Sequence, residues 1–232
     1  MAAERLARIL ALLAGTEGST MHTLCEVAAE VTGASGAGVM LLAEGRPQAS
    51  LCTTDEVSAL IEELQHGLGE GPCVDAHRTG TVVAEPDLAA PGIPRWMAFS
   101  PRALAGGARA VFGYPVRIGT VRIGALNLYR DRPGRLGDDQ HADAIVMADV
   151  AARAILAAQA AAPPDGLAIE LQSDAEHWDV VHQAAGIVSV QLDLPVADAL
   201  VRLRAHAFRT DRPITEIARE VVGRRLELER DP

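Results

Sequence analysis

The sequence predicts an α+β fold in which an antiparallel sheet with flanking helices is followed by an all-α part of three helices. Two observations predict the first part: segments with strand patterns follow one another as a meander, and helical segments enclose them at both ends. A third observation predicts the second part, because no strand pattern occurs after residue 166. This order differs from the alternating strands and helices of a dinucleotide-binding fold.

The chain of 232 residues is long enough for two small domains. Its strongest break is the run Ala-Ala-Ala-Pro-Pro-Asp-Gly at 160–166, because consecutive prolines cannot continue a helix. We therefore predict a first domain at 1–160, a linker at 161–166 and a second domain at 167–232.

Local patterns predict the elements of the first domain. Residues 36–43 form an apolar run typical of a buried strand, and Gly-Thr at 119–120 suits a tight hairpin. Pro72 stands at a favourable first position of a helix. In chain order we predict helices at 2–14 and 19–32, strands at 36–43 and 48–53, helices at 55–65 and from residue 72, a strand at 81–84, a short helix at 101–104, strands at 109–117 and 121–129, and a long helix at 138–158.

The N-terminus has one feature of a secretory signal, since Arg5 and Arg8 precede a short apolar run at 9–14. However, the apolar residues within 6–13 have the spacing of an amphipathic helix, and Glu4 stands among the residues before the run. We therefore predict a helix there. No stretch approaches the roughly 18 uncharged apolar residues that a membrane span needs, so no contact with a membrane is expected.

The second domain begins with a heptad stripe, in which apolar or small residues step by three or four positions through 167–192. Pro195 opens a second helix that runs to about residue 209, and Pro213 or Thr215 opens a third that ends near Glu229. Three such helices make a small core, so stabilisation by a partner chain is expected. The stripe consists of Leu167, Leu171, Ala175, Trp178, Val181, Ala185, Val188 and Leu192.

Composition excludes several classes of protein. All 21 basic residues are arginine, and a chain without lysine cannot be a Walker A nucleotide-binding protein, a Schiff-base enzyme, a protein kinase or a Ser-x-x-Lys acyltransferase. The formal net charge of −10 argues against a general affinity for nucleic acid or anionic membranes. Any nucleic-acid site must therefore be local.

The three cysteines, Cys25, Cys52 and Cys73, include no C-x-x-C pair, so a disulfide scaffold is not expected and a cytoplasmic location is predicted. The chain contains neither G-x-S-x-G nor H-E-x-x-H and no convincing set of metal ligands. We therefore expect neither an enzyme nor a metal site. An enzyme with Cys73 as its nucleophile stays a remote alternative, which requires a base near the thiol.

The glycine-rich turn at 67–73 is the candidate site of the first domain. Three glycines at alternating positions beside a helix start would let the backbone approach a small ligand or an anion, which makes Gly69, Gly71 and Cys73 candidate ligand-binding residues. The alternative is a flexible connector over the sheet. Cys73 is either a redox-reactive thiol with a pKa depressed by the helix N-terminus or a structural buried thiol.

Arginines gather in the second domain, where residues 195–225 hold seven of them against four carboxylates. Arg202 and Arg209 are seven positions apart and hence share a helix face, and Arg209 and Arg212 flank the turn into the third helix. These residues and Arg219 are candidate phosphate contacts. The alternative is an ordinary solvated face with ion pairs between residues four apart.

Three segments of the second domain, at 183–192, 199–207 and 214–222, resemble an ANTAR domain, the three-helix RNA-binding output module of bacterial transcription antiterminators. The first domain resembles a GAF domain, a small-molecule sensor. The segments that carry this second resemblance are 36–43, 67–73 and the strand 124–129. Together the two domains resemble a GAF-ANTAR transcription antitermination regulator of the type common in actinobacteria.

The resemblance implies a homodimer that holds a tandem pair of RNA stem-loops and so prevents a terminator hairpin, under the control of a signal at the sensor. Dimerisation would use the helix at 138–158 and the heptad stripe. The candidate RNA-binding residues are Arg202, Arg209, Arg212 and Arg219, with Gly186 and either Ala184 or Ala207 as close-packing positions that shape the helix crossings. Phe208 is expected in the core.

Two departures from the family pattern bear on function. Ala185 stands where many relatives have lysine, which removes one potential phosphate contact. In the sensor, Asn127 is followed by Leu128, so the signature of cyclic-nucleotide GAF domains is only partly present and the sequence indicates no particular ligand or cofactor. A dimeric ligand sensor or scaffold that signals through protein contacts, without RNA, stays the alternative function.

Overall fold

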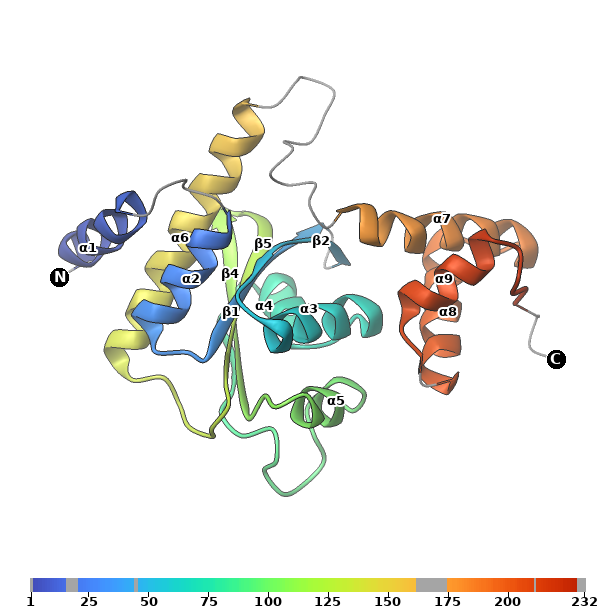
Figure 1. Ribbon diagram of the computed structural model, residues 1–232, viewed down its shortest axis with the longest axis horizontal. Helices are drawn as coiled ribbons and strands as arrows, with labels where there is room; N and C mark the ends of the chain where they lie inside the picture. The colour runs from blue at the N-terminus through green and yellow to red at the C-terminus, as the bar shows by residue number, and fades with distance from the viewer. Residues whose placement is uncertain (1, 16–20, 44–45, 162–174, 211, 229–232) are drawn as a thin grey trace. The chain divides into compact units, whose positions relative to one another are not determined.

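The structure is a computed structural model that describes residues 2–15, 21–43, 46–161, 175–210 and 212–228 (Figure 1). By its internal contacts the chain divides into two compact units, Met1–Ser173 and Asp174–Pro232. Residues 162–166 of the predicted linker, together with Leu167 and Leu171 of the heptad stripe, lie outside the described residues.

The N-terminal unit is an antiparallel sheet between helices, which confirms the predicted α+β class. Within the described residues the sheet has five strands in the order β2-β1-β5-β4-β3, and every neighbouring pair is antiparallel. In chain order the elements are α1 (Ala2–Ala14), α2 (Met21–Thr32), β1 (Gly36–Ala43), β2 (Arg46–Thr53), α3 (Glu56–Leu68), α4 (Pro72–Thr79), β3 (Val83–Glu85), α5 (Phe99–Ala105), β4 (Ala110–Ile118), β5 (Val121–Arg130) and α6 (Asp138–Ala161).

Helices cover both faces of this sheet: α2 and α6 lie on one side, and α3 and α4 lie on the other (Figure 1). Successive side chains of a strand point to opposite faces, so each strand contributes to two different layers. On β5, Leu126 and Leu128 belong to the apolar core that α2 and α6 complete. Asn127 lies between them in sequence and therefore faces α3 and α4. One face is thus apolar, whereas the other carries buried polar groups.

The first helix is fastened to the last helix of the unit by ion pairs. Arg5 and Arg8 of α1 each place a guanidinium nitrogen 2.7 Å from Oδ1 of Asp143 on α6, whose side chain is buried. Arg5 also donates to the carboxylate of Asp139 at 2.9 Å. A buried carboxylate needs such partners, because an unpaired charge is strongly disfavoured away from water. These contacts fix α1 against the N-terminal half of α6.

Cys25 of α2 and Cys52 of β2 form a disulfide, with their Cα atoms 6.3 Å apart. No disulfide scaffold was expected from the sequence, and this single bond was not anticipated. The two residues are 27 positions apart in the chain, and no local spacing reveals that α2 packs over the strand that carries Cys52. Cys73 is the free cysteine and is buried.

The C-terminal unit consists of α7 (Ala175–Leu192), α8 (Val196–Thr210) and α9 (Ile214–Val222). From Val181 to Leu192 the residues of the heptad stripe are buried, and Val181, Ala185, Val188 and Leu192 pack with α8 and α9 of the same chain. Residues 181–192 of the stripe are therefore not free to form the predicted dimer contact.

Two local predictions for this unit were wrong. The third helix ends at Val222 and not near Glu229, because Gly223 closes it and Arg224 adopts a left-handed backbone conformation with φ 53°. Phe208 lies outside the core, with 51% of its surface exposed. The buried stripe of α8 ends at Ala207, and the next residue is rotated by about 100° around the helix, away from α7 and α9.

Among the described residues, no single helix is long and apolar enough to cross a membrane. The segments Asp179–Leu192 and Val196–Thr210 pass that test together by length and composition alone, across a bend of 105°.

Candidate functional site

The predicted sensor residues lie in a tight turn between α3 and α4. Gly69 caps α3 with φ 68°, and Gly71 precedes α4 with φ 134°, so both positions need the conformational freedom of glycine. Glu70 between them accepts hydrogen bonds from the backbone N–H groups of Ala98 and Phe99 at 2.7 and 2.8 Å. The turn is thus fixed to the start of α5, which argues against the alternative of a flexible connector.

A buried polar cluster lies beneath this turn. Gln65 of α3 accepts a hydrogen bond from the backbone N–H of Cys73 through Oε1 at 2.7 Å, and a Cβ at Gly71 would clash with the same side chain. Glu62, one helical turn before Gln65, is also buried. Its Oε1 lies 2.5 Å from the position that a Cβ would occupy at Gly38 of β1. A glycine in β1 therefore makes room for a carboxylate from α3.

Asn127 of β5 lies at the centre of the same face. Its cross-strand neighbours are two glycines, Gly38 on β1 and Gly113 on β4. The Asn127 side chain is fully buried, and neither its Oδ1 nor its Nδ2 has a hydrogen-bond partner among the described residues. The Nε2 atom of Gln65 is also buried and has no hydrogen-bond partner among the described residues. Buried amide groups without partners are disfavoured, so these atoms call for a hydrogen-bond partner that the described protein groups do not supply.

The electrostatics of the cluster argue against a reactive Cys73. Burial raises the pKa of the Cys73 thiol well above its usual value, and the nearby Glu62 carboxylate raises it further, while the hydrogen bond with Gln65 lowers it. Of the two alternatives for Cys73, these effects favour the structural buried thiol over a thiol with a depressed pKa, because desolvation outweighs the helix dipole. Cys73 is therefore a protonated, poorly nucleophilic thiol at neutral pH.

Sequence reasoning found the turn and missed Glu62 and Gln65. The signal was present, because the buried residues of α3 include Ser58, Ile61, Glu62 and Gln65, at the spacing of one helix face. Polar residues on a face that packs against a sheet are unusual. Recognising them required knowledge of which face of the helix is buried.

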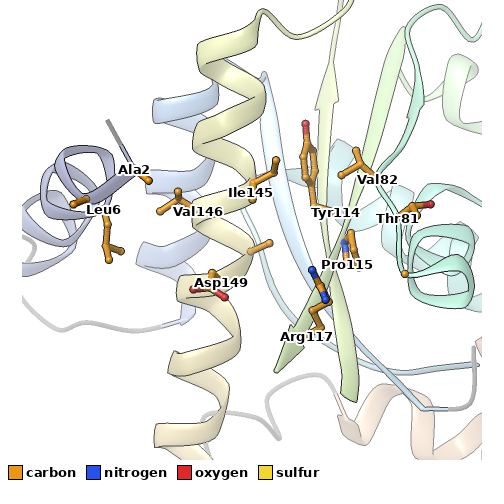
Figure 2. A pocket seen from close by; sticks show the side chains of 13 residues that line it. Ala2, Leu6, Thr81, Val82, Tyr114, Pro115, Arg117, Ile145, Val146 and Asp149 are labelled. Atoms are coloured by element: carbon orange, nitrogen blue, oxygen red, sulfur yellow. The ribbon is translucent and has the colours of Figure 1, made fainter. Parts of the chain in front are cut away.

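A second hollow of the N-terminal unit, which we call the α1–α6 hollow, has a volume of about 620 Å³ and lies on the other side of the sheet (Figure 2). Figure 2 shows Ile145 and Val146 of α6, Leu6 of α1, and Tyr114 of β4 around it. The Tyr114 hydroxyl is already within hydrogen-bond distance of His141 Nδ1, at 2.9 Å. The hollow is lined mainly by apolar side chains and has no buried polar atom without a partner. Among the described residues, no group of three or more His, Cys, Asp or Glu could hold a metal ion.

In the C-terminal unit, α8 presents the predicted arginines on its exposed side. Arg209 is exposed and Arg202 is partly exposed, and their spacing of seven places them on one face. Phe208 and Val201, also seven positions apart, lie about 100° further round the exposed side of the helix and are more than half exposed. This exposed face, formed by Val201, Arg202, Phe208 and Arg209, combines cationic groups with an aromatic ring. We call it the α8 face.

His206 adjoins the α8 face and is neutral near physiological pH. Partial burial lowers its pKa, and the positive charges of Arg209 and Arg212 lower it further, against the raising effect of Glu220. An arginine nitrogen of Arg209 lies 3.1 Å from His206 Nδ1. Because arginine can only donate, Nδ1 accepts this bond and His206 carries its proton on Nε2.

Arg212 and Arg219 lie outside α8, in the turn that precedes α9 and on α9 itself. The guanidinium of Arg212 lies 2.7 Å from Glu220 and 3.1 Å from Glu216, so its charge is balanced within the chain and it fixes the turn to α9. The pKa of Glu220 is lowered mainly by this pair. Arg219 lies on the exposed side of α9. Of the four predicted contacts, the structure therefore brings two together, Arg202 and Arg209.

The predicted close-packing positions have different environments. Ala184 and Ala207 are buried in the core of the unit, which matches a packing role and keeps them out of reach of RNA. Gly186 does not have the predicted close-packing role, because a Cβ at this position would meet no atom within 4 Å. It lines a hollow of about 700 Å³ beside Val190, between α7 and the residues that follow α9. The glycine is therefore not required by any described helix crossing.

Comparison with known proteins bears on both units. A GAF domain model matches residues 14–156, and an ANTAR domain model matches residues 170–222. No curated protein matches the chain. Among solved structures, the chain is similar to the GAF domain of a phosphoenolpyruvate-protein phosphotransferase from Coxiella burnetii, with a TM-score of 0.52 and 15% identity over 68% of this chain and 95% of that one.

The GAF domain of the Acinetobacter phosphoenolpyruvate-protein phosphotransferase is similarly close, with a TM-score of 0.50 and 14% identity over 69% of this chain and 96% of that one. At such identities the likeness shows the fold alone. The GAF model spans more than half of the chain, and the ANTAR model follows it directly in the C-terminal unit. The chain therefore belongs to the GAF-ANTAR family, in which a GAF domain is followed by an ANTAR domain.

Proposed function

We propose that this protein is a signal-responsive, RNA-binding transcription antitermination regulator of the cytoplasm, and not an enzyme. The observation that carries the proposal is the α8 face, where Phe208 lies exposed beside Arg209 within an ANTAR domain. The sequence pattern predicted Phe208 in the core, and the other aromatic residue of the unit is Trp178. The high pKa of the Cys73 thiol supports the absence of a nucleophilic enzyme mechanism.

Each group of the α8 face has a role in this proposal. RNA is read mainly in single-stranded loops, whose unstacked bases lie against aromatic rings while arginines contact the phosphates. Phe208 would stack on one loop base, and Arg202 and Arg209 would hold the backbone on either side. A face with two arginines on a chain of net charge −10 predicts binding that is local and sensitive to salt.

Two stem-loops in tandem require two α8 faces, hence a homodimer. We place its interface on α6, where Ile145 and Leu156 are each 48% exposed and share a helix face eleven positions apart. Exposed large apolar residues on one face of a long helix are typical of helix pairing between chains. The stripe residues within 181–192 are buried against α8 and α9 of the same chain. They therefore stabilise the fold of one chain and are not part of the proposed dimer interface.

We propose that the signal is a small polar molecule bound among Glu62, Gln65, Asn127 and the backbone of the Gly69–Cys73 turn. The carboxylate accepts hydrogen bonds, whereas the free amide groups of Asn127 can both donate and accept. A ligand with neighbouring donor and acceptor atoms, such as an amide or a nitrogen heterocycle, matches this set. Native mass spectrometry of the protein from its own host tests this part, because a co-purified small molecule should be lost in Asn127→Leu.

The RNA proposal is tested by fluorescence anisotropy with a labelled tandem stem-loop RNA. Phe208→Ala should weaken binding about 5- to 150-fold, since stacking on an aromatic ring contributes about 1–3 kcal/mol per base. Arg202→Ala and Arg209→Ala should each reduce the slope of log affinity against log salt by about one. Arg132→Ala, an exposed arginine between β5 and α6 and outside the proposed interface, is the matched control and should leave both quantities unchanged.

The alternative function, a dimeric scaffold that signals through protein contacts, makes the opposite prediction. In that case no structured RNA binds at low salt, although the dimer forms. Arg209→Glu separates the two functions when the mass in solution is measured in parallel. A retained dimer mass with lost RNA binding supports antitermination, and equal RNA binding by Arg209→Glu and the parent chain contradicts it.

A further inference from the structure

The Cys25–Cys52 disulfide joins a core helix to a strand at the edge of the sheet. Cys25 has no exposed surface, and Cys52 is 7% exposed. In the described sheet, β2 is an outer strand that pairs with β1 on one side. The bond therefore fastens α2 to a strand whose other side makes no hydrogen bonds within the sheet.

The ladder between β1 and β2 is irregular beside this bond. Its register shifts between Val39 and Met40 and again between Leu41 and Leu42, and Val39 is the direct partner of Cys52. Edge strands with interrupted ladders open locally at lower free energy than central strands. Such opening would expose the sulfur of Cys52 to a small reagent, while Cys25 stays covered by the core.

The third cysteine is isolated from this pair. Cys73 lies on the opposite face of the sheet, where it packs with Met40, Leu42 and Ala125. It is fully buried and its thiol is protonated at neutral pH. Oxidation or reduction of Cys25 and Cys52 would therefore proceed without thiol–disulfide exchange with Cys73. Cys73 can then serve as an internal standard when thiols are counted.

The pair is also well placed to influence α6. Cys25 and Ala28 of α2 belong to the same buried cluster as Met147 and Ala151 of α6. Among the described elements, α6 is the last before the C-terminal unit. A change in the position of α2 therefore reaches, through direct packing, the helix on which the dimer interface is proposed.

We propose that Cys25 and Cys52 form a reversible dithiol–disulfide couple, a modification site through which hydroperoxides act on the sensor domain. The proposal rests on the proposed function, because a regulator of transcription works in a reducing compartment, where disulfides are usually transient and redox-sensing. A chain kept reduced there would acquire the observed bond on oxidation, and α2 would then be fastened to β2.

The chemistry balances with a hydroperoxide as the oxidant. The Cys52 thiolate attacks one peroxide oxygen, the O–O bond breaks, and an alcohol or water leaves with a sulfenic acid on Cys52. The Cys25 sulfur then attacks that of Cys52, the S–S bond forms and the S–O bond breaks, which releases water. Two thiols and one hydroperoxide thus give a disulfide, an alcohol or water, and water. A cellular dithiol returns the two electrons.

The test begins with the full chain, reduced by thioredoxin, and counts thiols after unfolding. The reduced chain should take one alkyl label on each of its three cysteines, and the chain treated with equimolar hydrogen peroxide should take one, on Cys73. Peptide mapping should find Cys25 linked to Cys52. The site is overturned when thioredoxin cannot open the bond in the folded chain, or when peroxide does not restore it.

The second measurement is the affinity for the tandem stem-loop RNA in each redox state. We expect a change of about fivefold or more between the reduced and oxidised chains, the usual lower range of coupling between sites. Cys52→Ser, and separately Cys25→Ala in case the first folds poorly, should abolish the response to peroxide. An RNA affinity that is identical in the two redox states contradicts the regulatory role.

The two proposals can fail separately. When no RNA binds in either redox state, the proposed function fails, and amide exchange of α2 and α6 then decides the redox couple. Slower exchange in both helices after oxidation supports the couple as a device of the sensor. Unchanged amide exchange in both helices would mean that the disulfide has no effect on the dynamics of the sensor domain. That result overturns the proposed redox couple.

Discussion

Gly113→Ala is a sharp test of how closely α4 approaches the sheet. A Cβ at this position would lie 2.5 Å from the carbonyl carbon of Pro72 and 3.0 Å from the backbone nitrogen of Cys73. Ordinary contacts begin near 3.4 Å, so the start of α4 must move away by about 1 Å. Overpacking of this kind costs about 1–3 kcal/mol, and loss of the hydrogen bond between Cys73 and Gln65 adds about 1 kcal/mol. We expect the N-terminal unit to lose about 2–4 kcal/mol of unfolding free energy.

Urea unfolding of the full chain measures this loss through the fluorescence of Trp96 in the N-terminal unit, in a Trp178→Phe background where Trp96 is the remaining tryptophan. Gly186→Ala is the matched control, because a Cβ there would meet nothing within 4 Å and alanine favours a helix by about 0.5–1 kcal/mol over glycine. It should leave the Trp96 transition unchanged and raise the stability of the C-terminal unit. A Gly113→Ala chain within about 0.5 kcal/mol of the parent would refute the close approach of α4.

Three further predictions concern other parts of the chain. Reduction of the Cys25–Cys52 bond should lower the unfolding free energy by about 3.5 kcal/mol, the chain-entropy value for a loop of 27 residues, and an unchanged urea midpoint would contradict it. His206 has a lowered pKa in the folded state, so the unfolded chain binds protons more readily and stability should fall as pH drops below about 6.5. His206→Gln should remove that part of the pH profile, whereas an identical profile would disprove the assignment. Tyr114→Phe should lose about 1 kcal/mol with its hydrogen bond to His141, measured by thermal unfolding against the parent chain, and an unchanged unfolding temperature would contradict that contribution.

Most elements of the fold were accessible from local patterns. The strand at 36–43 was predicted with the bounds that β1 has, because eight residues without charge between turn signals are typical of a buried strand. The first helix was likewise predicted over the range of α1, from the spacing of its apolar residues. The end of α9 was predicted too late, since an amphipathic pattern continues past Gly223 although the backbone reverses there.

The candidate sites were only half predictable. The arginines at 202 and 209 were found from their spacing alone, because residues seven apart on a helix share a face whatever surrounds it. The ion pair between Arg212 and Glu220 was not predicted, because Arg212 precedes α9 and Glu220 lies within it, and the two meet only once the turn has formed. Asn127 was noticed in the sequence, but its unpartnered amide and its flanking glycines depend on strand register.

The sequence by itself determined the class of the fold and the side of α8 on which cationic groups stand, because these depend on periodicity and local turn chemistry, and its motifs carried the resemblance to the family. Tertiary structure alone decided that Cys25 meets Cys52, that Glu62 enters the space above Gly38, and that Phe208 is exposed. Each of these depends on which face of one element packs against another. That choice is made by the summed burial of many side chains, and no single segment of the chain encodes it.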